Sequence, residues 1–206
     1  MLLGELVNMR AIESDDAPLV HRWLNDPVVM RGWGWSAPAV SRQEVVGQIE
    51  SWLAQEGAQG RPASLIAESL GGDAVGLVVL RVDRPEARSV ELSLLVGDPA
   101  RWGQGLGADM LHTILDACFG GWGIHRVEVR VEAGNARALA LYCRCGFREE
   151  GRLRQAAYLD GQYADIVLLA LLAPEWERST TSAADDGSGR RGETLPAHRL
   201  EDDALP

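Results

Sequence analysis

Hydrophobic residues recur at two different spacings along the chain, and each spacing predicts one kind of element. Alternating apolar residues and short apolar runs are typical of strands, whereas a spacing of three to four residues is typical of helices. Strands are therefore predicted at residues 6–12, 65–70, 74–82, 89–96, 126–131 and 163–172.

Four helices are predicted between these strands. The first begins after a capping sequence at residues 14–16 and ends at Asn25, Asp26 and Pro27, because proline cannot continue a helix. The second opens with a capping box at residues 41–44. The last two are predicted at residues 107–118 and 136–145.

This order of elements predicts the fold class. One strand and two helices come first, then an antiparallel meander, and finally a β-α-β-α-β half. We expect an α/β (α+β) fold with a mixed, mostly antiparallel central sheet of six to seven strands and helices on both faces. Ligands in such sheets tend to bind where neighbouring strands part.

The composition divides the chain into a domain and a tail. Residues 1–177 are long enough for one domain that buries roughly 70% of its surface. Residues 178–206 are polar and are predicted to be a disordered tail, because they cannot bury enough apolar surface to offset ordering entropy. The tail holds six acids and four arginines, so −8 of the net charge of −10 belongs to the domain.

Charge and composition exclude several classes of function. The charge of −10 disfavours nucleic acid as a partner. It would attract a cationic substrate, or it serves solubility alone. No apolar run approaches the roughly 20 residues of a membrane span, and the start lacks the order of a signal peptide, so a cytoplasmic protein with no membrane partner is predicted. The three cysteines and four histidines lack metal-ligand spacing, so no metal site is predicted.

The first candidate for chemistry is a glycine-rich loop between a strand and a helix. Residues 89–96 lead directly to Gly103, Gly105 and Gly107, and the helix follows. Backbone N–H groups and the positive end of the helix can converge on a phosphate there, and side chains would obstruct it. A structural turn remains the alternative. A dinucleotide fingerprint is disfavoured because no acidic residue follows a second strand at the expected distance.

The second candidate is the helix at residues 136–145. It begins after Asn135, carries Tyr142 two turns later, and exits through Gly146 and Phe147. Together with the glycine loop, this stretch resembles the GNAT superfamily of acyltransferases, over nearly all of residues 6–177. The stretches at 23–27, 150–154 and 160–165 resemble its RimJ/RimL-type branch, which acetylates protein N-terminal amines and has relatives that acetylate polyamines and aminoglycoside-like antibiotics.

The resemblance implies a GNAT-like sheet and acetyl-CoA as co-substrate, with pantetheine pairing along the edge of the strand at 89–96. The family pattern has Arg or Gln where this chain has Trp102, with Arg101 one position earlier. A cradle of backbone N–H groups does not depend on that side chain. The predicted cofactor-binding residues are Leu94, Leu95, Val96, Arg101, Trp102, Gly103, Gln104, Gly105, Leu106, Gly107, Ala108, Asn135 and Ala138.

Amide formation needs two proton transfers, and each has a candidate residue. Glu91 lies on the strand that leads to the loop and is a candidate base through water; an exposed strand carboxylate is the alternative. The resemblance implies that Tyr142 is the general acid for the leaving thiolate, and a core tyrosine is the alternative. Backbone N–H groups near Leu95 and Val96 could stabilise the oxyanion if this strand splays from its neighbour.

The acceptor site is predicted between the first two helices and residues 151–165. Trp33 and Trp35 are candidate substrate-binding residues in the connection between those helices, where they could stack on a sugar or an ammonium. An anchor for the loop is the alternative.

Three functions remain from the sequence. The first is transfer of an acetyl group to a small cationic amine, such as an aminoglycoside-like antibiotic or a polyamine, which would include a role in antibiotic resistance. The second is acetylation of protein N-termini of the ribosomal-protein type. The third is a non-catalytic acyl-CoA-binding module. The sequence leaves open whether the chain forms a homodimer.

Overall fold

The computed structural model describes residues 1–33, 39–56 and 64–176. The strands are β1 (Leu2–Leu3), β2 (Val7–Ala11), β3 (Ser64–Ser69), β4 (Ala74–Arg84), β5 (Ser89–Val96), β6 (Arg126–Glu132), β7 (Arg148–Leu159) and β8 (Gln162–Leu172). The helices are α1 (Ala17–Leu24), α2 (Pro27–Gly32), α3 (Arg42–Glu56), α4 (Leu106–Asp116) and α5 (Ala136–Arg144), and a π-turn over Ala117–Gly121 continues α4.

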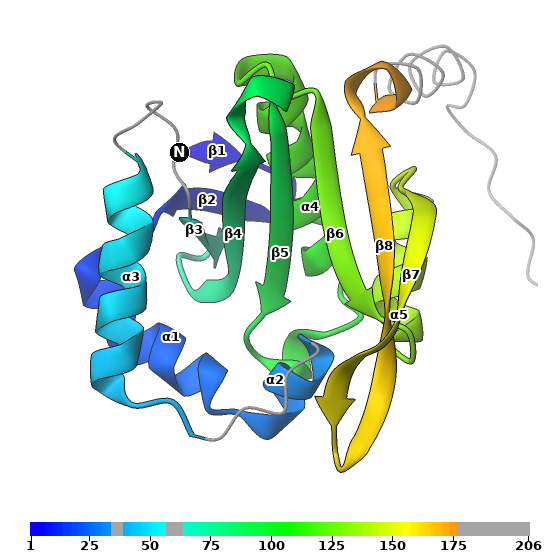
Figure 1. Ribbon diagram of the computed structural model, residues 1–206. Coiled ribbons are helices and arrows are strands. Elements are labelled where there is room, and N and C mark those ends of the chain that lie inside the picture. The colour runs from blue at the N-terminus through cyan, green and yellow to red at the C-terminus, as the bar shows by residue number, and fades with distance from the viewer. Residues whose placement is uncertain (34–38, 57–63, 177–206) are drawn as a thin grey trace, which may run out of the picture.

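These strands form one mixed sheet in the order β1-β2-β3-β4-β5-β6-β8-β7 (Figure 1). Neighbouring strands are antiparallel except for β5 and β6, which are parallel. The predicted fold class is confirmed, and the described sheet has eight strands instead of six to seven. The additional strands are β1, which has only two residues, and β7, whose side chains are mostly exposed and show no apolar alternation.

Helices cover both faces of the sheet, as predicted. Met110 and Ile114 of α4 and Tyr142 of α5 are buried in one core with apolar residues of the sheet. A second core on the other face holds Val20 of α1 and Ile49 of α3. The central strands are therefore fixed from both sides.

Helix α2 was not predicted, because Asn25, Asp26 and Pro27 were interpreted only as the end of a helix. The side chain of Asp26 accepts hydrogen bonds from the backbone N–H groups of Val28 and Val29, and Pro27 occupies the first helical position. Proline is favoured there, since its missing N–H would have no helical partner. The same residues thus end one helix and begin the next.

The parallel ladder between β5 and β6 is short. It pairs Ser89 with Arg126 and ends where Glu91 faces Glu128. Beyond that point β5 remains paired with β4 as far as Val96. The far half of β5 therefore has an open edge on the side of β6.

The predicted domain boundary is not tested, because residues 177–206 lie outside the described part of the chain.

Candidate active site

The open edge of β5 presents backbone groups to the gap between β5 and β6. The N–H of Gly97 donates to the carbonyl of Val75, on the side of β4. The backbone N–H and C=O groups of successive residues in a strand point to opposite neighbouring strands. The backbone groups of Leu95 therefore point toward β4, whereas those of Leu94 and Val96 point toward the gap. The predicted splay of β5 from its neighbour is present. On the open side lie the backbone groups of Leu94 and the N–H of Val96, whereas the carbonyl of Val96 accepts a hydrogen bond from Trp102 and the N–H of Leu95 is turned into the ladder with β4.

A cleft lies at this gap, between the C-terminal end of α2, the end of β5, the start of α4 and one side of α5. Tyr142 and Trp33 also line it. All predicted cofactor-binding residues except Gln104 line the cleft, namely Leu94, Leu95, Val96, Arg101, Trp102, Gly103, Gly105, Leu106, Gly107, Ala108, Asn135 and Ala138.

The glycine loop has the backbone that its sequence requires. Gly103 and Gly105 have φ of 78° and 85°, in the left-handed region where other residues are strained. Gly105 caps α4. Gly107 has no positive φ, and a Cβ there would lie 3.7 Å from Val96 and 3.8 Å from Leu141, both in the cleft lining. The amide of Gln104 donates to the carbonyl of Ala100, so this side chain fastens the loop from outside the lining.

Trp102 and Arg101 shape the start of the loop. The indole N–H of Trp102 donates to the carbonyl of Val96 over 2.9 Å, so the ring is fixed to the end of β5. The guanidinium of Arg101 lies 3.1 Å from Asp73 and 3.9 Å from Asp98. Trp102 therefore replaces the polar side chain of the family pattern with a packed ring.

The charge of the lining is opposite to that of the protein. In a chain of net charge −10, three arginines line the cleft, and no lining residue in the described part of the chain is a carboxylate. The three are Arg101, Arg137 and Arg144. A site of this charge, next to backbone N–H groups at a helix start, suits a polyanion such as the phosphates of CoA.

Asn135 joins α5 to α2. Its side-chain oxygen accepts from the N–H of Ala138 and caps α5, and its amide nitrogen donates to the carbonyl of Gly32 over 2.7 Å. Both functions of the amide are therefore structural here. The bond to Gly32 holds the end of α2 against the cleft.

Tyr142 lies in the cleft wall with its ring packed edge-on against Phe147, 5.3 Å between ring centroids. Burial of the phenol, with a smaller effect from Cys145, raises the pKa of Tyr142 well above its ordinary value, so the hydroxyl stays protonated at neutral pH. Within the described residues we find no hydrogen-bond partner for this hydroxyl. A protonated, untethered hydroxyl at the cleft can act as a proton donor.

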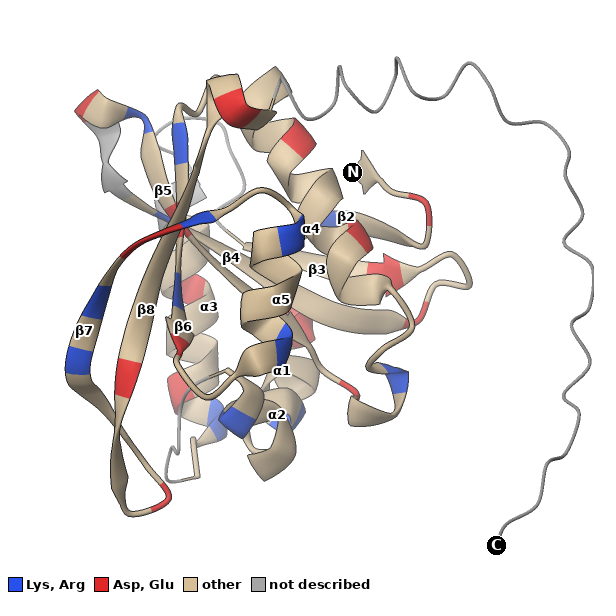
Figure 2. Cartoon of the chain, turned by 90° about the vertical axis from the view of Figure 1, so that its right-hand side faces the viewer, with Lys and Arg blue, Asp and Glu red and all other residues tan. Residues whose placement is uncertain are grey.

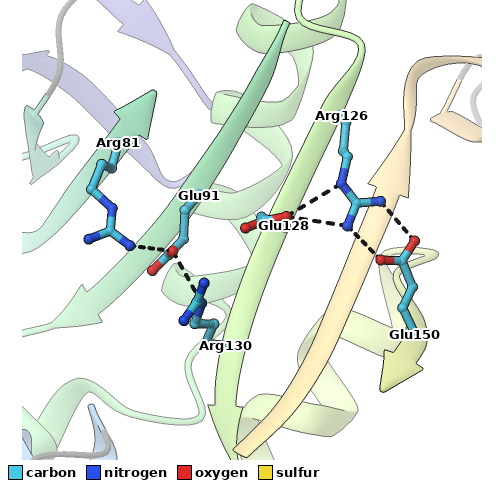
Figure 3. Close-up of polar contacts among 6 residues, drawn as sticks. All are labelled: Arg81, Glu91, Arg126, Glu128, Arg130 and Glu150. Carbon is cyan, nitrogen blue, oxygen red and sulfur yellow. Dashed lines mark hydrogen bonds and ion pairs between the residues drawn. The ribbon is translucent and has the colours of Figure 1, made fainter. Parts of the chain in front are cut away.

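Glu91 occupies a different environment from Tyr142. Its carboxylate pairs with Arg81 of β4 and lies 3.2 Å from Nε of Arg130 of β6 (Figure 3). It is not part of the cleft lining. The two arginine partners hold the carboxylate in an ion-pair group that joins β4, β5 and β6. Its role as base stays a prediction. The side chain is only 14% exposed, so it is also not the exposed strand carboxylate of the alternative; its ion pairs favour a structural role.

A second ion-pair group lies beside it on β6. Arg126 hydrogen-bonds to Glu128 of the same strand and to Glu150 of β7 (Figure 3). The hydrogen bonds from Arg126 lower the pKa of Glu150. Together the two groups tie β4, β5, β6 and β7 on one face of the sheet.

Two of the segments predicted for the acceptor site lie beside each other, namely the connection between the first two predicted helices, which holds α2, and residues 151–165. Arg31 of α2 forms a 3.1 Å ion pair with Asp160, in the turn between β7 and β8. Figure 1 shows that turn beside α2 at the bottom of the molecule. Trp33 lines the cleft, whereas Trp35 lies outside the described residues.

Sequence reasoning missed several lining residues. Val29 and Gly32 belong to the unpredicted helix α2. Arg137, Leu141 and Arg144 lie on α5 at a spacing that places them on one side of a helix. That spacing was a signal available in the sequence.

In the described part of the chain, no three His, Cys, Asp or Glu residues lie close enough to hold a metal ion. No helix there has the length and apolar character needed to cross a membrane.

Comparisons with known proteins agree with this geometry. A profile of the acetyltransferase (GNAT) domain matches residues 7–148. The chain is similar to spermidine N(1)-acetyltransferase of Vibrio cholerae serotype O1, with 26% identity over 84% of this chain and 97% of that enzyme. It is also 24% identical to aminoglycoside N(6')-acetyltransferase type 1 of Klebsiella pneumoniae, over 72% of this chain and 77% of that enzyme.

A solved structure has the same fold. The crystal structure of spermidine N-acetyltransferase from Vibrio cholerae, in complex with CoA and spermine, superimposes with a TM-score of 0.74. The two proteins are 24% identical, and the match covers 84% of this chain and 98% of the other.

Proposed function

The chain belongs to the acetyltransferase (GNAT) family, and we propose that it transfers an acetyl group from acetyl-CoA to a small cationic amine, of the polyamine or aminoglycoside class. The finding that carries this proposal is the cleft itself. It joins an open strand edge, a glycine loop at a helix start, three arginines without a lining carboxylate, and Tyr142. Each part matches a group of the co-substrate. The strand edge matches the amides of pantetheine, and the glycine loop matches the diphosphate. The arginines match the phosphate charge, and Tyr142 matches the thiol.

The residues of the cleft divide the work of binding. The backbone N–H and C=O groups of Leu94 extend the sheet by pairing with the amides of pantetheine. The N–H groups of Leu106 and Gly107, at the start of α4, hold the diphosphate. The lining arginines add the charge that a polyanion requires.

The same residues support the reaction. The ammonium must first give a proton to solvent, because an alkyl ammonium with a pKa near 10 is a free amine only about once in a thousand at pH 7. The amine nitrogen then bonds to the thioester carbon, and the carbon–sulfur bond breaks. The N–H of Val96 donates to the thioester oxygen as it gains negative charge. Tyr142 then donates its proton to the departing thiolate.

Two observations support a small cationic acceptor. The domain carries a charge of about −8, which steers cations toward it. The relatives reported above are named for spermidine and aminoglycoside acceptors. A protein N-terminus, as in the RimJ/RimL-type branch, would be recognised through backbone contacts and would need little steering by charge.

An acceptor screen tests the proposal. Spermidine, an aminoglycoside and a peptide with a free N-terminus would be compared by release of free thiol and by the mass of the acetylated product. The chain contains no lysine, so acetylation of its own side-chain amines adds no background. We expect the highest kcat/KM with one of the two small cations. A clear preference for the peptide would overturn the proposed acceptor class.

Binding is measured separately from turnover. Acetyl-CoA at 100 times its Kd should stabilise the native protein by about 2.7 kcal/mol, which a thermal unfolding assay detects. Stabilisation without thiol release for any amine would instead identify a non-catalytic acyl-CoA-binding module.

A further inference from the structure

The three arginines of the cleft differ in their partners. Arg101 is held by Asp73 and Asp98. Arg137 and Arg144 have no carboxylate partner among the described residues. An arginine that lines a pocket without a counter-ion can accept an anionic group without first breaking an ion pair.

Arg137 has the better-defined position of these two. Its Cζ lies 3.8 Å from the centroid of the Trp102 ring, so its guanidinium rests on the indole. The ring is itself fixed by the hydrogen bond from its N–H to Val96. A Cβ at Gly32 would lie 3.7 Å from both the guanidinium and the indole, which shows how closely α2 covers the pair. The charge is thereby held at the start of the glycine loop.

Stacking leaves the guanidinium free to bind phosphate. An arginine on an aromatic ring uses its flat face for the contact, and its five N–H groups point outward in the plane. Trp102 immediately precedes Gly103, whose surroundings are open: apart from its two chain neighbours, no described residue has an atom within 4 Å of a Cβ placed there. The N–H groups of Arg137 can therefore reach a group seated in the loop.

We infer that Arg137 is a cofactor-binding residue that supplies, from α5, the phosphate contact that the loop lacks at Trp102, and that the Trp102 ring is its platform. The inference rests on the proposed binding of acetyl-CoA. The Arg or Gln of the family pattern would bring a polar side chain from the loop itself. Here the loop brings a ring, and the ring positions a cation from another element.

The first test compares Arg137→Gln with Arg42→Gln. Arg42 begins α3, is exposed and is not part of the cleft lining, so it controls for the loss of one positive charge. Kd for acetyl-CoA would be measured by titration calorimetry, and thermal unfolding without ligand would verify the fold of each variant. We expect Arg137→Gln to weaken binding roughly 10- to 100-fold, as for a lost charged hydrogen bond, and Arg42→Gln to change it less than twofold.

Shortened donors identify the phosphate. The loss should persist in full with acetyl-3'-dephospho-CoA, which keeps the diphosphate. It should vanish with S-acetylpantetheine, which has no phosphate, so that wild type and Arg137→Gln then show equal kcat/KM. If the loss disappears already with the dephospho donor, Arg137 contacts the 3'-phosphate, and the diphosphate assignment is wrong.

A double-mutant cycle tests the platform. In the background of Trp102→Leu, the change Arg137→Gln should reduce the affinity for acetyl-CoA much less than it does in wild type, because the guanidinium is no longer positioned. Additive losses would overturn the role of Trp102.

The inference and the proposed function fail in different ways. If wild type does not bind acetyl-CoA, the proposed function is wrong, whatever Arg137 does. If wild type binds and Arg137→Gln binds equally well, only the inference is wrong. The same holds if the loss falls on Arg144→Gln instead.

Discussion

Tyr142 gives the sharpest prediction for a single residue. Tyr142→Phe removes the hydroxyl and keeps the ring that packs against Phe147. We expect kcat to fall by 10²- to 10⁴-fold, as for the loss of a general acid, with little change in Kd for acetyl-CoA. Steady-state kinetics and titration calorimetry give the two numbers. Full activity of the variant would show that another group or solvent protonates the thiolate.

Glu91 tests whether a carboxylate on β5 is a base or a tie between strands. Its ion pairs with Arg81 and Arg130 favour the tie. We therefore expect Glu91→Gln to lower the free energy of unfolding while the pH profile of kcat/KM keeps its shape. If Glu91 were the base, the rate would fall most at low pH, and raising the pH would partly restore it. Chemical unfolding and a pH series of kcat/KM distinguish the two.

A substitution at Gly107 distinguishes an effect on acetyl-CoA binding from an effect on stability more clearly than a substitution at Gly105. Gly105 has a φ of 85°, and a Cβ there would lie 3.2 Å from Leu6, so a substitution such as Gly105→Val would strain the loop itself. Gly107 lies within α4 and has ordinary space around its Cβ position. Gly107→Ala should thus stabilise the fold by up to about 1 kcal/mol, because alanine restricts the unfolded chain.

The same methyl group should weaken acetyl-CoA binding, since it enters the cleft between Val96 and Leu141. For Gly107→Ala, urea unfolding should therefore show a higher free energy of unfolding, whereas titration calorimetry should show a lower affinity for acetyl-CoA. An unchanged Kd would place the diphosphate somewhere other than this loop.

Among the elements, β2 and the turn before α1 are joined by an ion pair with a predictable pH dependence. Arg10 of β2 binds Asp16 through two hydrogen bonds of 2.7 Å. Burial alone would raise the pKa of Asp16, but the bonds from Arg10 and from the N–H of Glu13 outweigh it and lower the pKa. A lowered folded pKa means that the pair stabilises the protein above the unfolded pKa of about 4, and that this contribution is lost as the pH falls through the folded value.

Asp16→Asn should therefore lower the free energy of unfolding by about 2 kcal/mol at pH 7. The difference from wild type should shrink as the pH is lowered below about 4. Urea unfolding at a series of pH values measures it. A difference that is the same at pH 7 and pH 3 would contradict the role of the charge.

A strand could be predicted from the sequence where one of its faces is buried, because burial requires a pattern of apolar residues. The alternation in β5 and β6 and the glycines of the loop are local patterns, and they located the cleft. Strand β7 was missed because its edge position leaves nearly every side chain exposed, so no apolar pattern is required.

The contacts between elements could not be predicted in the same way. The stacking of Arg137 on Trp102 joins residues 35 positions apart, and the tie from Asn135 to Gly32 spans 103 positions. Neither contact leaves a trace in local spacing, because the first depends on how α5 meets the glycine loop and the second on how α5 meets α2. The sequence therefore predicts the backbone cradle, whereas the choice of side chains around it requires the tertiary structure.

For the whole molecule, the last prediction concerns the tail. Residues 178–206 show no apolar periodicity with which to dock, so truncation after residue 177 should leave stability and turnover within about twofold. Trp176 provides the contrast, because its indole N–H donates to Asp116 and its ring packs near His112. Trp176→Ala should lower the free energy of unfolding by about 3–5 kcal/mol.

Thermal and chemical unfolding of the two variants test this contrast. A large loss of stability or turnover after truncation would show that the tail packs on the domain or covers the cleft. Figure 2 shows the charges of the domain distributed over many elements. Removal of the tail therefore leaves most of the acidity of the protein in place.

The short ladder between β5 and β6 has a consequence for cooperativity. The sheet consists of two halves whose shared parallel ladder has only three residue pairs, so few backbone hydrogen bonds cross the seam between β5 and β6. A co-substrate that pairs along the open edge of β5 bridges this seam and serves as a missing strand. Without it, local opening should begin at the seam, so that substrate binding and completion of the fold are one event.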